Sequence, residues 1–344
     1  MRSFIILVFF LFFSSTVYGQ RGPIPPIESG FGADGQFSVK VETFRSPKWR
    51  DEVVTVFLPA ELNRPAPAIF FSHGYGATDP SAYLAFLKHI ASRGYVVVYS
   101  PYRTVGDSFP EKYETMFAGF KKAVKKYRRF IDTSKIGFVG HSFGGGAVPA
   151  LARRALIEEG WGSAGSFMFM LAPFYSYNIS QDQLLNFPSN TKLVVQVYDE
   201  DTINDHRMGK DIFETISIPN TEKDYIVLYS DRSTVFNYNL LADHGVPSTI
   251  QVEGRTNVKD SMDYYGVWRI FDALAEYTFT DSRVAKNIAL GDGNREQRFM
   301  GRWPEPDGRN VKELDATDLP VVTKPESFYR FQFSNPMNPR RDFQ

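Results

Sequence analysis

Short apolar segments alternate with amphipathic segments along most of this 344-residue chain, and that alternation constrains the fold more than any other feature. Eight segments have the character of strands, namely residues 39–44, 53–58, 66–72, 95–99, 135–139, 166–171, 192–198 and 225–229. Helical spacing is found at residues 79–92, 110–130, the stretch after Ser142, 207–216 and 261–279. Strands and helices that alternate in this way build parallel sheets covered by helices. The sequence therefore predicts an α/β fold with a mostly parallel eight-stranded sheet and helices on both faces.

The first nineteen residues differ in composition from the rest of the chain. Arg2 precedes an apolar run from Phe4 to Phe13, and small residues surround Val17 and Gly19. The run is too short to cross a bilayer comfortably, and the arrangement is typical of a secretory signal peptide. We predict a signal peptide at residues 1–19 and a secreted or periplasmic protein, with an uncleaved membrane anchor as the alternative.

The remaining chain divides into three parts by composition. Residues 20–38 are rich in proline and glycine and predict an irregular leader, residues 39–280 carry the alternating pattern, and residues 281–344 form an extension that we expect to wrap the domain. No later stretch approaches 18 consecutive apolar residues, so no integral membrane segment is expected in the mature chain. The chain has no cysteine, which excludes thiol chemistry and cysteine-based zinc sites.

The charge balance argues against nucleic acid as a partner. Lys plus Arg and Asp plus Glu number 39 each, so the formal net charge is zero and no overall field attracts a polyanion. Residues 121–129 contain a basic cluster, but Phe117, Phe120, Val124 and Tyr127 recur on the opposite face of the same predicted helix. A solvated outer helix face explains the cluster.

The segment Gly140-His141-Ser142-Phe143-Gly144 has the G-x-S-x-G pattern of a nucleophile elbow. It follows a predicted strand directly and leads into a predicted helix, which is the strand, sharp turn and helix that such an elbow requires. Small residues at 140 and 144 let the turn close, and a helix N-terminus favours developing negative charge. We predict Ser142 as a nucleophile, and a glycine-rich turn with a serine cap as the alternative.

A serine hydroxyl needs a base, and the chain has five histidines, namely His73, His89, His141, His206 and His244. His244 lies in the long connection between the last predicted strand and the last predicted helix. That is the position of the base in the chain order serine, acid, histidine. His244 is the preferred candidate, with His206 second.

The acid that orients the base should follow the strand 192–198, and this strand ends in Asp199-Glu200-Asp201. Asp201 lies in the turn three residues beyond the strand, so we prefer it to Asp199. Two alternatives remain: solvated loop carboxylates, or a calcium site that includes Asp205, although the spacing lacks the glycine and terminal glutamate of an EF-hand loop.

A tetrahedral oxyanion needs two N–H donors. One is expected from Phe143, the residue after the nucleophile, and the other from the loop Ser72-His73-Gly74-Tyr75-Gly76 after the third strand. Gly74 can take the conformation that turns the next amide inward, which favours the Tyr75 N–H. An ordinary glycine turn is the alternative.

The segments Ser72-His73-Gly74-Tyr75-Gly76 and Gly140-His141-Ser142-Phe143-Gly144 resemble those of the α/β-hydrolase superfamily, and most of all those of its dienelactone hydrolase, chlorophyllase and polyester-hydrolase branch. The resemblance covers about residues 40–280. The resemblance implies the α/β-hydrolase fold, triad roles for Ser142, Asp201 and His244, and oxyanion donors at Tyr75 and Phe143. The sequence departs from the family where Tyr198 replaces a common glycine, in the late position of His244, and in the long extension.

Only about twenty residues separate the strands 166–171 and 192–198, so a large lid is not expected. Phe174, Tyr175 and Tyr177 in this connection are expected either to line an acyl or aromatic pocket or to pack at the surface.

The sequence thus predicts a secreted serine hydrolase that cleaves a small or polymeric ester without a metal or organic cofactor. Two alternatives stay open. One is an exported, non-catalytic binding protein that kept the fold, and the other is an acyltransferase, which would use the same residues.

Overall fold

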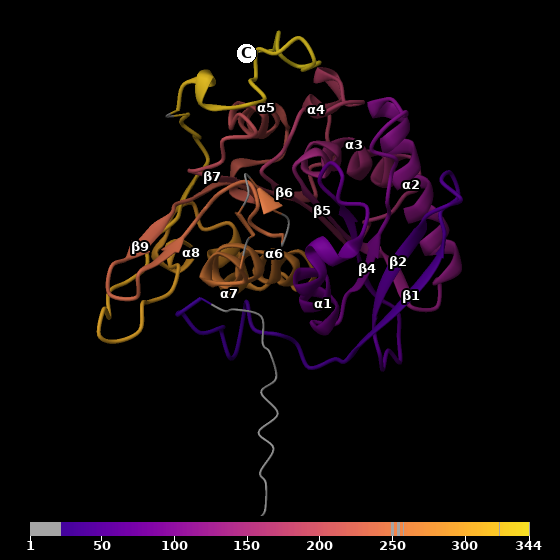
Figure 1. The fold of residues 1–344 in the computed structure, drawn as a ribbon. Coiled ribbons are helices and arrows are strands. Elements are labelled where there is room, and N and C mark those ends of the chain that lie inside the picture. The colour runs from indigo at the N-terminus through magenta and orange to yellow at the C-terminus, as the bar shows by residue number, and fades with distance from the viewer. Residues whose placement is uncertain (1–21, 249–250, 253–254, 257, 323, 344) are drawn as a thin grey trace, which may run out of the picture.

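A computed structural model describes residues 22–248, 251–252, 255–256, 258–322 and 324–343. The predicted signal peptide lies outside the described residues. A single nine-stranded sheet with the order β1-β2-β4-β3-β5-β6-β7-β8-β13 crosses the molecule, and helices cover it on both sides (Figure 1). The fold is therefore the mostly parallel α/β fold that the sequence predicts, and a ninth strand from the C-terminal extension joins the eight expected ones.

Strands β3 to β8 form the parallel centre of the sheet, whereas β1, β2 and β13 pair antiparallel at its edges. The strands are β1 (Val39–Arg45), β2 (Val53–Pro59), β3 (Ala66–Ser72), β4 (Val96–Tyr99), β5 (Ile131–His141), β6 (Gly165–Leu171), β7 (Thr191–Tyr198), β8 (Lys223–Leu228) and β13 (Asp315–Thr317). Two small hairpins stand apart, β9 (Asp231–Ser233) with β10 (Tyr238–Leu240), and β11 (Gln251–Val252) with β12 (Arg255–Thr256). The carboxyl ends of the parallel strands β3 to β8 all lie at the same end of the sheet, and ligand sites of such folds lie at this end.

The helices include the five predicted ones, which begin and end near their expected positions, and several short ones that the sequence did not predict. In chain order, the helices are η1 (Pro80–Tyr83), α1 (Leu84–Ser92), α2 (Phe109–Lys126), α3 (Phe143–Ile157), α4 (Gln181–Leu185), α5 (Arg207–Thr215), η2 (Asn220–Glu222), the π-helical η3 (Met262–Trp268), α6 (Arg269–Thr280), α7 (Arg283–Ala289), α8 (Arg295–Arg298) and η4 (Glu326–Phe328). Ser108 and Glu111 form a capping box that starts α2. This helix ends earlier than expected, because β5 begins at Ile131 and pairs with the start of β3 before a register shift.

The core consists of two apolar clusters, one on each face of the sheet. Strand β4 shows the division, since Val97 and Tyr99 belong to the cluster under α1 and α6, whereas Val96 and Val98 belong to the cluster under α2, α3 and α5. Side chains of a strand alternate between faces, so a strand covered on both sides must be apolar throughout. This explains the continuous apolar runs of the sequence.

The leader and the extension both lie against this layered domain. Ile24 of the leader is buried, and the Gly32 amide donates to Asp272 on α6. The extension contributes α7, α8 and β13 and then passes over α4 and α5 towards the C-terminus (Figure 1). In the described part of the chain, no helix has the length and apolar character needed to span a membrane.

Candidate active site

Ser142 occupies a strained turn between β5 and α3. Its φ of 54° and ψ of −119° lie in a region that residues other than glycine rarely adopt, at a cost of about 1–3 kcal/mol. The turn closes because no side chain intervenes: a Cβ at Gly140 would lie 2.3 Å from the Gly144 carbonyl oxygen, and one at Gly144 would lie 1.9 Å from that of Ser72. The backbone thus presents the Ser142 hydroxyl at the carboxyl end of the sheet.

His244 stands between Ser142 and Asp201. Its Nε2 is 2.9 Å from the Ser142 Oγ, and its Nδ1 is 2.8 Å from Asp201 Oδ2. The other oxygen of Asp201 accepts hydrogen bonds from the amides of Ile203 at 2.7 Å and Asn204 at 3.1 Å. Burial by itself raises the pKa of the Asp201 carboxyl, but the field and hydrogen bond of His244, the charge of His206 and the Ile203 amide together lower it below the ordinary value. Asp201 is therefore a carboxylate, and it can hold His244 with Nδ1 protonated and Nε2 free to accept a proton.

The alternative residues from the sequence have other partners. His206 Nε2 donates to the Tyr198 carbonyl at 2.9 Å, and Asp199 Oδ1 accepts from the amide and hydroxyl of Ser230. Asp205 is paired with Arg207. The described residues contain no cluster of three or more histidine or carboxylate groups suited to a metal ion. The structure brings His244 and Asp201 to Ser142, and not His206 or Asp199.

Two backbone amides near Ser142 have no acceptor among the described residues, those of Tyr75 and Phe143. The neighbouring amides are occupied, since Ser142 N donates to the Leu171 carbonyl at 2.9 Å and Gly74 N donates to the Tyr83 hydroxyl at 3.0 Å. Unpaired N–H groups beside a strained serine, one of them at the N-terminus of α3, form a suitable environment for a developing oxyanion.

A chain of hydrogen bonds that the sequence did not reveal connects the Gly74 loop to His244. The Tyr83 hydroxyl accepts from Gly74 N and lies 2.8 Å from His141 Nδ1, and His141 Nε2 lies 2.8 Å from the His244 carbonyl oxygen. A carbonyl only accepts, so His141 Nε2 is the donor and its Nδ1 accepts from Tyr83. Burial, together with the field of His244, lowers the pKa of His141 to about 3 and keeps the ring neutral. The one sequence signal for this role was the histidine inside the elbow motif.

A cavity of about 690 Å³ opens over the Ser142 hydroxyl. Aromatic and aliphatic side chains dominate its lining, which consists of Gly74, Tyr75, Phe109, His141, Ser142, Phe143, Phe174, Ile203, Asn204, His244, Ser248, Arg330, Phe331 and Met337. Three of these residues come from the C-terminal extension. Such a volume and lining suit a small organic group.

Phe174, Tyr175 and Tyr177 were expected either to line a pocket or to pack at the surface, and Phe174 lines this cavity. Tyr175 and Tyr177 are not among its lining residues, and their hydroxyls donate to the carbonyl oxygens of Gln332 at 2.7 Å and Met337 at 3.1 Å. The extension lies against these two rings and binds their hydroxyls. Their position in the chain predicted the correct end of the sheet but not the segment that covers it.

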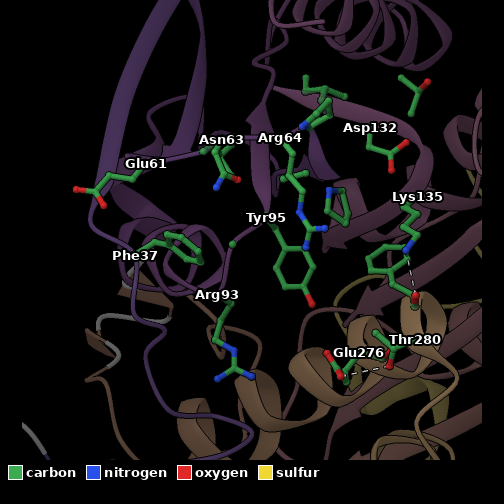
Figure 2. A pocket seen from close by; sticks show the side chains of 18 residues that line it. Phe37, Glu61, Asn63, Arg64, Arg93, Tyr95, Asp132, Lys135, Glu276 and Thr280 are labelled. Carbon is green, nitrogen blue, oxygen red and sulfur yellow. Dashed lines mark hydrogen bonds between the residues drawn. The ribbon is translucent and has the colours of Figure 1, made fainter. Parts of the chain in front are cut away.

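A second cavity, of about 780 Å³, lies at the opposite end of the sheet, beside the amino ends of β3, β4 and β5 (Figure 2). Its lining has charges of both signs, including Arg64, Arg93, Lys135, Asp132 and Glu276. None of the five histidines lines it. Several of its polar groups are bound to their own surroundings, as when Lys135 donates to the Phe279 carbonyl at 3.2 Å.

A mostly parallel sheet with helices on both faces, and a strained serine at the turn between β5 and α3, is the architecture of the α/β-hydrolase fold, and this is the fold of the chain. The chain is 32% identical over 139 residues to Cutinase 1 of Thermobifida cellulosilytica, an alignment that covers 39% of this chain and 52% of that protein. It is equally similar to the Cutinase of Thermobifida fusca (strain YX), of which the alignment covers 45%.

The chain thus spans about half the length of the curated relatives that it matches. No family model matches it. The resemblance to α/β hydrolases that the sequence predicts is confirmed by this similarity.

Proposed function

We propose that this protein is a serine hydrolase that cleaves carboxylic esters through an acyl-enzyme on Ser142. One observation carries the proposal: Ser142 Oγ, His244 and Asp201 form a continuous hydrogen-bonded series at 2.9 and 2.8 Å, starting from a strained backbone at Ser142. A merely structural serine would not require positive φ, and a merely structural histidine would not leave one nitrogen facing a hydroxyl at the floor of a cavity.

Each residue has a defined chemical role in the proposed reaction. Ser142 Oγ attacks the ester carbonyl while His244 Nε2 takes its proton, and Asp201 stabilises the imidazolium that forms. The amides of Tyr75 and Phe143 donate to the oxyanion. His244 then gives the proton to the leaving alcohol. A water, activated by the same imidazole, attacks the acyl-enzyme and releases the acid, so that Ser142 regains its proton.

An ester is the substrate class that both the cavity and the relatives favour. The cavity is lined mainly by apolar rings, which suit the hydrocarbon part of an acyl group, and the two relatives are named cutinases. Only the residues between β6 and β7, including the short α4, lie where a lid would be inserted, so an extended or polymeric ester could reach the site as well as a small one.

The organisation of the chain forms part of the same proposal. Residues 1–19 would act as a signal peptide that directs export, residues 20–38 as a leader, residues 39–280 as the hydrolase domain and residues 281–344 as an extension on that domain. Protein sequencing of the secreted form would test the cleavage site.

A fluorophosphonate probe tests the central step, because it reacts with an activated serine and not with an ordinary one. We expect the purified protein to be labelled and to hydrolyse nitrophenyl esters, and Ser142→Ala to lose both. His244→Ala should lose hydrolysis by a factor of about 10³ or more, whereas His206→Ala, the matched control, should keep it. Absence of labelling, or labelling that survives in Ser142→Ala, would contradict the proposal and favour a non-catalytic binding protein.

A further inference from the structure

The last part of the extension pairs with the loop that carries Asp201. The amides of Arg330 and Phe331 donate to the carbonyl oxygens of Thr202 and Ile203, each at 2.8 Å, and Asp205 N donates back to the Phe331 carbonyl at 3.0 Å. Residues 330–331 therefore form a short parallel pairing with residues 202–205. Backbone hydrogen bonds fix the register, so the side chains of this segment have defined positions at the cavity.

Contacts beyond this pairing hold the segment in place. Arg340 is buried and forms two hydrogen bonds with Asp211 on α5, and its Nη2 donates to Gln181 at the start of α4 at 2.9 Å. A bidentate arginine and carboxylate pair with a further acceptor is among the stronger polar contacts in proteins. The hydroxyls of Tyr175 and Tyr177 bind the same segment between these two points. The segment is thus attached along its length and forms a fixed wall of the cavity.

Among the described residues that line the cavity, Arg330 is the only one with a permanent charge. None of these lining residues is a carboxylate, and Arg330 forms no salt bridge with any carboxylate in the described part of the chain. Its guanidinium lies over the Phe331 ring, 5.6 Å from the centroid. A cation at the rim of an apolar cavity, without a protein counter-charge, attracts an anionic group on a ligand.

The aromatic side chains lead from this cation to the elbow. The rings of Phe331 and Phe174 pack edge to face with their centroids 5.1 Å apart. The centroids of Phe174 and Phe143, the residue after Ser142, lie 6.4 Å apart. A ligand that follows these rings has its reactive carbonyl at Ser142 and its far end near the guanidinium. In such a ligand, an apolar chain or ring therefore separates the reactive carbonyl from the charged group.

From this arrangement we propose that the C-terminal extension determines substrate specificity, and that Arg330 binds the free carboxylate of an ester substrate whose acyl part is a dicarboxylic acid. The inference rests on the proposed function, because it concerns the acyl side of the same site. Arg330 is a specificity-determining residue in it and not a catalytic one. Phe331 and Met337 provide the apolar wall beside it.

Two nitrophenyl esters of equal acyl chain length test the proposal, one made from a dicarboxylic acid with its second carboxyl free and one from the neutral monocarboxylic acid. We expect Arg330→Gln to lower kcat/KM for the charged ester about fivefold, mostly through KM, and to change the neutral ester less than twofold. Arg330→Lys should recover part of the loss. Added salt should reduce the effect, since the contact is partly exposed.

The control variant is Arg302→Gln, an exposed arginine of the same extension that does not line the cavity, and it should leave both esters unchanged. An equal loss for both esters in Arg330→Gln, or no loss for either, overturns the specificity proposal while the hydrolase function stands. Wild-type protein that cleaves neither ester and is not labelled by a fluorophosphonate overturns the proposed function, and this inference with it.

Discussion

Two buried histidine and aspartate pairs are found among the described residues, and they differ in what surrounds them. His244 is 2.8 Å from Asp201, and His89 on α1 is 3.1 Å from Asp272 on α6. The second nitrogen of His244 faces the Ser142 hydroxyl beneath a cavity. The second nitrogen of His89 faces Asp34 of the leader at 3.0 Å, and its ring stacks on Trp268 at 4.5 Å.

The difference shows that a histidine and carboxylate pair does not by itself indicate catalysis. Burial alone would lower the pKa of His89, but the charges and hydrogen bonds of Asp272 and Asp34 outweigh burial and raise it. A ring held between two carboxylates keeps its proton and connects the leader, α1 and α6. A base needs one nitrogen with a free lone pair and a proton donor that can react, and His244 has both.

Exchange of each aspartate for asparagine should separate the two roles, and it should produce the largest difference between the two pairs. Asp201→Asn should lower kcat by a factor of about 10³ to 10⁴, because the amide no longer favours the correct tautomer of His244 or stabilises its charged form. Asp272→Asn should leave kcat per labelled serine within about twofold but lower the free energy of unfolding by about 1–3 kcal/mol. Active-site titration and chemical unfolding of both variants provide the measurements.

If Asp272→Asn loses kcat to the same extent as Asp201→Asn, the two histidine and aspartate pairs do not have different roles. The comparison also fails if Asp201→Asn has low activity only because it is unfolded, which its own unfolding curve would reveal. Since Asn at either position can still accept the backbone amides that bind the aspartate, neither change removes those contacts by necessity.

A second prediction concerns the backbone support that distinguishes His244 from His89. Tyr83→Phe keeps the ring but removes the hydroxyl that accepts from Gly74 N and donates to His141. We expect kcat to fall by about 10- to 100-fold with little change in KM, because the loop that carries Gly74 and the Tyr75 amide is no longer connected to His244. The pH dependence of kcat should keep its shape, since the ionising groups remain.

Tyr225→Phe is the matched control for that change. Tyr225 is buried as well, and its hydroxyl donates to the His206 carbonyl at 3.0 Å, away from Ser142. Tyr225→Phe should keep kcat, and it should lower the free energy of unfolding by about as much as Tyr83→Phe does. Equal kcat losses in both variants would mean that loss of any buried tyrosine hydroxyl has this effect. The hydrogen bonds from Tyr83 through His141 to the His244 carbonyl would then have no positioning role.

The sequence predicts the sheet and the elbow well because both depend on local patterns. Covered strands must be apolar throughout, and a sharp turn between a strand and a helix needs small residues at 140 and 144. The chain order of serine, acid and histidine also selects His244 and Asp201, which lie within hydrogen-bond distance in the structure. Their catalytic roles stay predictions until the variants are measured.

The sequence does not predict contacts made by segments without periodicity. The histidine inside the elbow motif does not reveal that His141 binds the His244 carbonyl, and no local pattern indicates that the extension lies over Tyr175 and Tyr177 and brings Arg330 to the cavity. These contacts join residues far apart in the chain, and the extension has neither strand nor helix spacing along most of its length. Only the folded arrangement of the domain determines where such a segment lies.

The smallest expected effect is the pH dependence of stability that His89 gives to the protein. Its pKa is raised in the folded state, so its contribution is complete at pH values below about 6.5 and is lost as the pH rises through the folded-state pKa. Wild-type protein should therefore exceed His89→Gln in Tm by a larger margin at pH 5.5 than at pH 8.5, by about 1–3 °C. Comparison with the variant removes the effect of other buried groups, among them Asp224, whose pKa burial raises to about 7.

His206 supplies a control of opposite sign. Burial lowers its pKa below the ordinary value despite the charge of Asp201, so its unfavourable effect is present at low pH and disappears as the pH rises. The margin of wild-type protein over His206→Gln should therefore grow from pH 5.5 to pH 8.5, whereas the margin over His89→Gln shrinks. A margin over His89→Gln that stays level or grows as the pH rises would show that the two carboxylates around His89 do not hold a proton on its ring. The contrast with His244 would then rest on the serine and the cavity alone.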